Sequence, residues 1–144
     1  ISFVNIEAGI KIDLSKAYLS GVNLRDIDLK GANLRGADLH SAKLRRANLR
    51  GANLREANLN GANLDSAYLR GANLREADLR GAHLNGVDLS EANLRDAKLG
   101  WSQWQQEDID KYIDVIKESE FDVIISYSGT TDETKIITRT ELFE

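Results

Sequence analysis

A leucine recurs at every fifth position from Leu14 to Leu99, without a break through eighteen successive units. The residue two positions before each leucine is also apolar: it is Ala in fourteen units and Val or Ile in the other four. The residue directly before the leucine is Asn or Asp in thirteen units, and the residue after it is Arg in nine. Apolar and polar positions therefore alternate around each leucine, which is the pattern of a very short strand with one buried face.

A period of five residues fits neither an α-helix nor a continuous strand. Gly occupies the second position after the leucine in eight units, and Gly and Asn readily adopt turn conformations that β-branched residues resist. The pattern predicts a short extended stretch followed by a turn, with the apolar pair pointing inward. One unit cannot bury its own leucine, but stacked units form a continuous column. We expect a core that contains Leu34, Leu54, Leu74 and Leu94.

The units resemble the Ala-(Asp/Asn)-Leu-x-x motif of the pentapeptide-repeat family, as in Gly-Ala-Asn-Leu-Arg at residues 51–55. The resemblance covers residues 12–101. It implies an all-β-dominated fold, a right-handed quadrilateral β-helix in which four units form one square coil. Eighteen units at four per coil give about 4.5 coils. The resemblance also implies a bacterial, often cyanobacterial, source.

Both ends of the repeat array depart from the motif. We expect residues 1–11 to form an irregular N-terminal segment or cap, and residues 102–144 to form a C-terminal cap. Apolar spacing predicts an amphipathic helix over about residues 105–119, and alternation predicts hairpin strands at 121–127 and 135–143. An exposed hairpin edge would allow a homodimer to form. The residues expected to close the C-terminal end of the rod are Trp101, Trp104, Ile109, Ile113 and Ile116.

The formal net charge of −4 hides an uneven distribution of charge. Residues 12–101 hold fourteen basic and eleven acidic side chains, a net charge of +3, whereas residues 102–144 hold four and eleven, a net charge of −7. Residues twenty apart should stack on one face of the rod. One column of arginines runs beside acidic residues that nearly neutralise it. A less balanced group forms the candidate interaction surface, which consists of Arg25, Lys43, Arg45, Arg46 and Arg50.

The sequence offers little for catalysis. It has no Cys, and its two histidines, His40 and His83, fall on different predicted faces. Neither a nucleophile, a pair of carboxylates, a phosphate-binding loop nor a metal-binding motif occurs at a functional spacing. We therefore predict a protein that is not an enzyme and that uses no cofactor or metal. No apolar run is long enough to span a bilayer, and the cytoplasm is the expected location unless a preceding segment carries an export signal.

Three non-enzymatic functions remain open. The first is a rigid scaffold for protein–protein interaction, with a partner that the sequence does not identify. The second is the DNA-mimic role that the resemblance implies for members that interact with gyrase, although their rods are acidic and longer. The third is binding of an anionic partner through the basic side chains. A net charge of +3 on residues 12–101 and the shortage of aromatic residues there disfavour nucleic acid as that partner.

Overall fold

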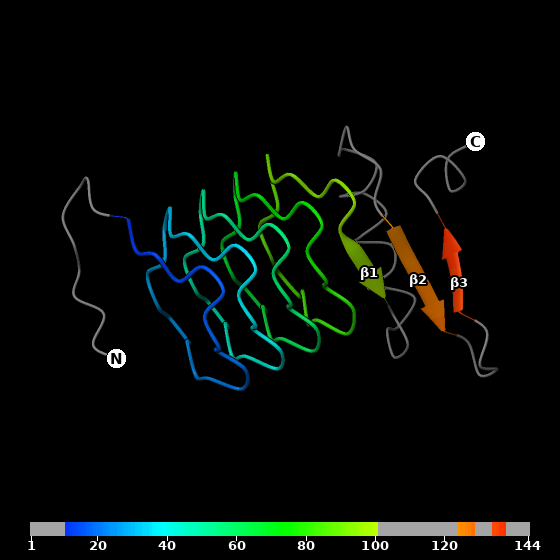
Figure 1. Cartoon of the computed structure of the whole chain (residues 1–144), viewed down its shortest axis with the longest axis horizontal. Helices are drawn as coiled ribbons and strands as arrows, with labels where there is room; N and C mark the ends of the chain where they lie inside the picture. The colour runs from blue at the N-terminus through cyan, green and yellow to red at the C-terminus, as the bar shows by residue number, and fades with distance from the viewer. Residues whose placement is uncertain (1–10, 101–123, 129–133, 138–144) are drawn as a thin grey trace.

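A computed structural model describes residues 11–100, 124–128 and 134–137 of the protein. Parallel bridges join residues that lie twenty apart, beginning with Asp13 and Asn33 and ending with Asp78 and Lys98. The successive coils lie side by side along one axis, in the order of the blue to green colours in Figure 1. Twenty residues per coil correspond to four five-residue units, so each coil has four sides. The expected β-helix of stacked repeat units is confirmed.

The backbone turns at the same position in every unit. The residue two after the leucine has a positive φ in all seventeen units from Leu14 to Leu94, and it is Gly in eight of them. A backbone hydrogen bond closes each turn, as where the Ala57 N–H donates to the Leu54 carbonyl at 3.0 Å. A positive φ at the third residue is the requirement of a type II turn, and glycine meets it without steric conflict. The period of five therefore follows from one left-handed corner per unit.

The Asn or Asp before each leucine fixes the beginning of the turn. Its side-chain oxygen accepts a hydrogen bond from the backbone N–H two residues later, as Asn53 does from Arg55 at 3.1 Å. All thirteen Asn and Asp residues at this position accept such a bond. This is an Asx-turn, in which the side chain takes the place of a backbone acceptor. The preference for Asn and Asp therefore has a structural cause.

Backbone hydrogen bonds tie each unit to the coils on both sides. The Leu54 N–H donates to the Asn73 carbonyl at 2.7 Å, and the Glu56 N–H donates to the Arg75 carbonyl at 2.9 Å. In the other direction, the Asn53 N–H donates to the Ala32 carbonyl at 2.9 Å. Because these bonds satisfy the backbone between coils, the interior needs no polar side chain. Among residues 11–100, no polar or charged residue is buried.

Leucine and alanine columns form the core that the sequence predicts. The side chains of Leu34, Leu54 and Leu74 are fully buried, and Leu94 is 2% exposed. The first coil is less well covered, because Leu14 is only partly buried. This coil also carries larger residues at three positions where the next coil has Ala. A larger residue covers more of the open end of the column, and the residues concerned are Ile12, Val22 and Ile27.

Three strands lie at the C-terminal end of the rod (Figure 1). Strand β1 (Lys98–Gly100) belongs to the last coil and pairs in parallel with β2 (Ile124–Ser128), with Leu99 opposite Ile125. Strand β2 pairs antiparallel with β3 (Thr134–Ile137), so the sheet order is β1-β2-β3. Strand β2 therefore continues one side of the β-helix beyond the last repeat unit.

Strands β2 and β3 overlap the two segments for which strands were expected, 121–127 and 135–143, and the rest of those two segments lies outside the described residues. The described residues contain no helix. Several expectations concern residues that lie outside the described ranges: all but Lys11 of the N-terminal segment expected over residues 1–11, the helix over about 105–119, and the cap residues Trp101, Trp104, Ile109, Ile113 and Ile116.

Candidate interaction surface

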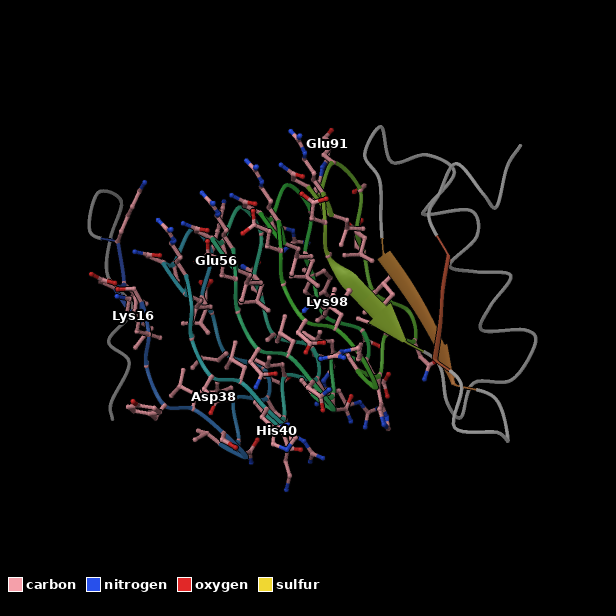
Figure 2. The ribbon with its side chains drawn as sticks, turned by 45° about the vertical axis from the view of Figure 1, so that its right-hand side comes forward. Lys16, Asp38, His40, Glu56, Glu91 and Lys98 are labelled. Carbon is pink, nitrogen blue, oxygen red and sulfur yellow. The ribbon has the colours of Figure 1, made fainter. Side chains whose placement is uncertain are left out.

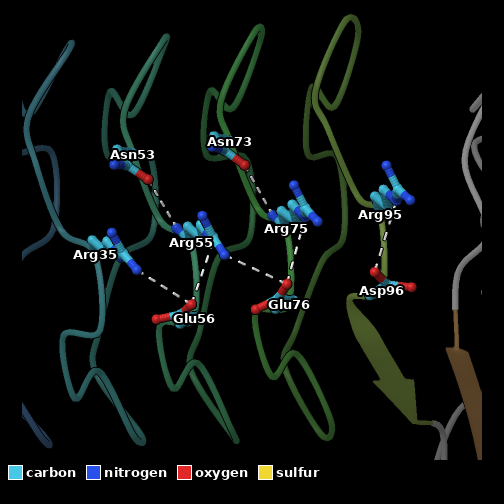
Figure 3. Close-up of polar contacts among 9 residues, drawn as sticks. All are labelled: Arg35, Asn53, Arg55, Glu56, Asn73, Arg75, Glu76, Arg95 and Asp96. Atoms are coloured by element: carbon cyan, nitrogen blue, oxygen red, sulfur yellow. Dashed lines mark hydrogen bonds and ion pairs between the residues drawn. The ribbon is translucent and has the colours of Figure 1, made fainter.

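One face of the rod carries a column of arginines, and we call it the arginine face. Its residues are Arg35, Arg55, Arg75 and Arg95. Arg55, Arg75 and Arg95 each pair with the acidic corner residue of their own unit, and Arg35 pairs with Glu56 of the next coil (Figure 3). Glu56 Oε1 lies 3.5 Å from Arg35 Nη2 and 3.3 Å from Arg55 Nε, and Arg55 Nη2 lies 3.7 Å from Glu76 Oε1.

This series of ion pairs nearly neutralises the arginine face, with three carboxylates for four arginines. Glu76 also pairs with Arg75 at 3.5 Å, and Asp96 pairs with Arg95 at 3.8 Å. Partial desolvation acts to raise the pKa of Glu56, but the hydrogen bond and charge of Arg35 and the charge of Arg55 outweigh it and hold the pKa below its ordinary value. Surface ion pairs of this kind contribute little individually. Their main effect is to prevent like charges in successive coils from repelling one another.

The five residues of the candidate interaction surface fall into two groups in the structure: two that are held by neighbouring side chains and three that are not. Arg46 Nε lies 2.8 Å from Asp26 Oδ1, so this arginine is paired. The Arg50 guanidinium lies 4.3 Å from the centre of the Tyr68 ring, in a cation–π contact, and donates to Asn48 Oδ1 at 3.3 Å. These two side chains are therefore held by their neighbours.

The other three predicted residues keep their charges exposed. Arg25, Lys43 and Arg45 have no ion-pair partner within residues 11–100, and the same is true of Lys30 in the adjoining unit. Arg25 and Arg45 occupy equivalent positions in successive coils, so their backbones are about 4.8 Å apart. Like charges stacked in this way repel one another, and Asp65, which follows Arg45 in the same column, offsets this repulsion only in part because it forms no ion pair with Arg45. We call Arg25, Lys30, Lys43 and Arg45 the open cation group.

Two further ion pairs were not predicted from the sequence. Asp78 and Arg80 flank the same leucine on the outer side and form two hydrogen bonds, of 2.6 and 2.8 Å. Desolvation acts to raise the pKa of Asp78, but the hydrogen bonds from Arg80 hold it below its usual value. Arg70 reaches Glu91 across one coil at 3.1 Å. The sequence spacing could have indicated both pairs. Asp78 and Arg80 lie two residues apart, and Arg70 and Glu91 lie twenty-one apart.

The histidines do not form a reactive site in the described part of the protein. His40 is exposed, and its backbone N–H donates to Asp38 Oδ1 at 3.1 Å (Figure 2). His83 is also exposed, on a different face. Residues 11–100 and the described strands contain no group of three His, Cys, Asp or Glu residues that could hold a metal ion. They also contain no helix of the length and apolarity needed to cross a membrane.

Comparisons with known proteins agree with the repeat architecture. The family model described as pentapeptide repeats matches in eight copies, over residues 12–51, 47–86 and 72–103. No curated protein matches the sequence. The solved structures of three pentapeptide repeat proteins are similar to it, and they come from Cyanothece 51142, the Arabidopsis thaliana thylakoid lumen and Nostoc Pcc 7120.

The extent of similarity differs among these structures. The Cyanothece protein Rfr23 is 43% identical, with a TM-score of 0.63, over 65% of this chain and 63% of its own. The present protein therefore spans less than two thirds of that relative. The Arabidopsis protein is 27% identical, with a TM-score of 0.68, over 85% and 80% of the two chains. The Nostoc protein is 38% identical, with a TM-score of 0.51, over 68% and 81%.

The ion pairs of the arginine face predict a stability that depends on pH. The folded-state pKa of Glu56 is lowered, so its carboxylate stabilises the fold above the ordinary glutamate pKa of about 4.3. This contribution is lost as the pH falls through the lower folded-state value. Wild type should exceed Glu56→Gln in free energy of unfolding at neutral pH, and the difference should disappear in acid. Urea unfolding at a series of pH values measures it, and an undiminished difference in acid would contradict the assignment.

Proposed function

The chain belongs to the pentapeptide repeat family, and we propose that it is a rigid, non-enzymatic scaffold for protein–protein interaction. The separation of inner from outer positions supports this proposal most directly. Each unit points its Ala and Leu into the core and the two residues that flank the leucine outward. The residue after each leucine can therefore vary without disturbing the core or the Asx-turn, while backbone ladders between coils keep the spacing of these side chains constant.

A surface of this kind suits recognition better than catalysis. Side chains on a rigid backbone lose less conformational freedom on binding than those on mobile loops. Its faces also differ: the arginine face is internally neutralised, whereas the open cation group is exposed and unpaired within the described residues. A partner can therefore distinguish one face of the rod from another by its charge.

The open cation group favours a second, finer proposal, that the partner presents an acidic protein segment to this part of the rod. Arg25, Lys43 and Arg45 repel one another in the free protein, and carboxylates from a partner would relieve this repulsion. Nucleic acid fits less well, because the protein as a whole is acidic and the ring of Tyr68 is already covered by Arg50.

The DNA-mimic alternative has no comparable support in the described surface. A mimic of duplex DNA needs columns of unneutralised acidic groups. On the arginine face, Glu56, Glu76 and Asp96 are instead paired with arginines. Residues 12–101 as a whole carry more basic than acidic side chains.

We also propose that residues 102–144 close the C-terminal end of the rod as a separate module. The pairing of β2 with β1 supports this idea, because it satisfies the backbone edge that the last coil would otherwise expose. The outer edge of β3 would then be the surface through which two copies could associate. The proposed module also includes the residues of 102–144 that lie outside β2 and β3.

Crosslinking in cells that express the protein naturally tests the scaffold proposal. The baits are wild type, Arg25→Glu/Arg45→Glu, and the control Lys16→Glu/Lys98→Glu, which changes the net charge by the same amount elsewhere on the rod. We expect a partner protein that crosslinks to wild type. Arg25→Glu/Arg45→Glu should lose this partner, and the control Lys16→Glu/Lys98→Glu should retain it. The purified partner should bind with the same preference. Equal capture by all three baits, or no capture above an empty control, would contradict the proposal.

Fluorescence anisotropy with a labelled polyglutamate peptide tests the acidic-partner proposal separately. Binding should occur at low ionic strength and weaken as salt is added. Arg25→Glu/Arg45→Glu should abolish the binding, and Lys16→Glu/Lys98→Glu should leave most of it intact. A duplex DNA of similar charge should bind less well. The absence of binding at low salt, an equal loss in both variants, or a preference for DNA would refute the acidic-partner proposal without affecting the scaffold proposal.

A further inference from the structure

Two Asn-Gly pairs, Asn60-Gly61 and Asn85-Gly86, occupy the same position within two repeat units and lie at different corners of the rod. Both glycines have a positive φ, of 67° and 66°. Each lies over a serine of the preceding coil, whose Oγ is 3.3 Å (Ser41) or 3.5 Å (Ser66) from the position that a glycine Cβ would take. The two pairs are thus closely matched in sequence, conformation and neighbours.

Asn-Gly is the sequence in which a backbone nitrogen most easily reaches the amide carbon of the preceding Asn. Glycine has no Cβ to obstruct the approach, and its backbone rotates more freely than that of other residues. The reaction requires the glycine nitrogen to be available, so a hydrogen bond from that N–H should slow it. The two corners differ in this respect.

Within the described residues, the Gly61 corner has a ladder hydrogen bond that the Gly86 corner lacks. The Gly61 N–H donates to the Arg80 carbonyl at 3.0 Å, and the turn around Asn60 is closed by a hydrogen bond of 3.0 Å. The Gly86 N–H makes no hydrogen bond to any residue in the described part of the protein. The bond that closes its turn, from Val87 to Leu84, is longer at 3.4 Å. Asn85 is also exposed, whereas Asn60 is partly buried.

We propose that Asn85 is a site of spontaneous deamidation and that the ladder protects Asn60 from the same reaction. The Gly86 nitrogen gives up its proton and attacks Cγ of Asn85, and a nitrogen–carbon bond forms. The bond between Cγ and the amide nitrogen of Asn85 breaks, and that nitrogen leaves as ammonia after taking up a proton. Water then opens the resulting succinimide at either carbonyl, which gives aspartate or isoaspartate. The reaction needs no enzyme, oxidant or cofactor.

The modification would change both charge and register in the coil that precedes β1. The Asn85 N–H donates to Asp65 Oδ1 at 3.0 Å, and the two residues occupy equivalent positions in successive coils. A carboxylate at position 85 would therefore stack over Asp65 and repel it. Isoaspartate would also add one carbon to the backbone of a unit whose ladder bonds depend on a constant length of five residues. Deamidation of Asn85 would therefore weaken the packing of successive coils near the C-terminal end of the rod as the protein ages.

Peptide mapping of the folded protein after incubation at mildly alkaline pH tests the proposal. Trypsin separates the two sites into peptides 81–95 and 56–70, and each also contains an Asn that is not followed by Gly. Tandem mass spectrometry then locates aspartate and isoaspartate in each peptide. We expect Asn85 to react about tenfold faster than Asn60 or more, the ratio that corresponds to about 1.4 kcal/mol of local opening. Isoaspartate should accumulate only at position 85.

Three controls separate the effect of the fold from that of sequence. The two isolated tryptic peptides should deamidate at similar rates, because neither retains the ladder. Asn85→Ser should abolish the reaction at this site, and Gly86→Ala should slow it by placing a Cβ beside the attacking nitrogen. The proposal is wrong if the folded protein deamidates Asn60 as fast as Asn85. It is equally wrong if Asn85 reacts no faster than Asn93, which lies in the same peptide and precedes Leu.

Discussion

The fold depends on one backbone corner in each repeat unit. The residue two after each leucine is held at a positive φ, and nine of these corners carry residues other than glycine. For residues other than glycine, the left-handed conformation costs about 1–2 kcal/mol each. The hydrogen bond that closes the turn, the Asx-turn before it and the ladder bonds to both neighbouring coils together stabilise the corner. Because the turn-closing bond recurs every five residues, with an Asx-turn in thirteen units, the coil keeps four sides and the leucines stay in register.

This constraint also determines what the surface can do. The interior positions are nearly invariant in size, so they carry little information that a partner could read. The outer positions do not pack in the core, and those after the leucine also lie outside the Asx-turns, so two opposite arrangements of charge can occupy the surface. On the arginine face, Glu56 joins arginines of two coils. In the open cation group, Arg25 and Arg45 stack without such a partner among the described residues. The contrast favours a surface that recognises a charged partner over one that carries out a reaction.

Much of the fold could be predicted from the spacing of residues, but the surface could not. A period of five placed Leu54 and Ala57 in the core, because the backbone alone decides which positions of the repeat point inward. The same period placed Arg46 and Arg50 in one basic cluster, although Arg46 pairs with Asp26 and Arg50 covers Tyr68. Long side chains can reach neighbours along a coil or across coils, and only the three-dimensional arrangement decides between them. The Asx-turns were also missed, since residue counts do not distinguish a structural Asn from a merely polar one.

The corner geometry can be tested directly by exchanging glycine and a larger residue at equivalent corners. Gly51 has a φ of 64° and no atom within 4 Å of the position of an added Cβ, so Gly51→Ala changes only the backbone preference. Ser41 has a φ of 54° at another corner. In equilibrium unfolding by urea, we expect Gly51→Ala to lower the free energy of unfolding by about 1 kcal/mol and Ser41→Gly to raise it by about 0.5 kcal/mol. If Gly51→Ala were neutral or stabilising, the left-handed corner would not be the constraint on which the fold depends.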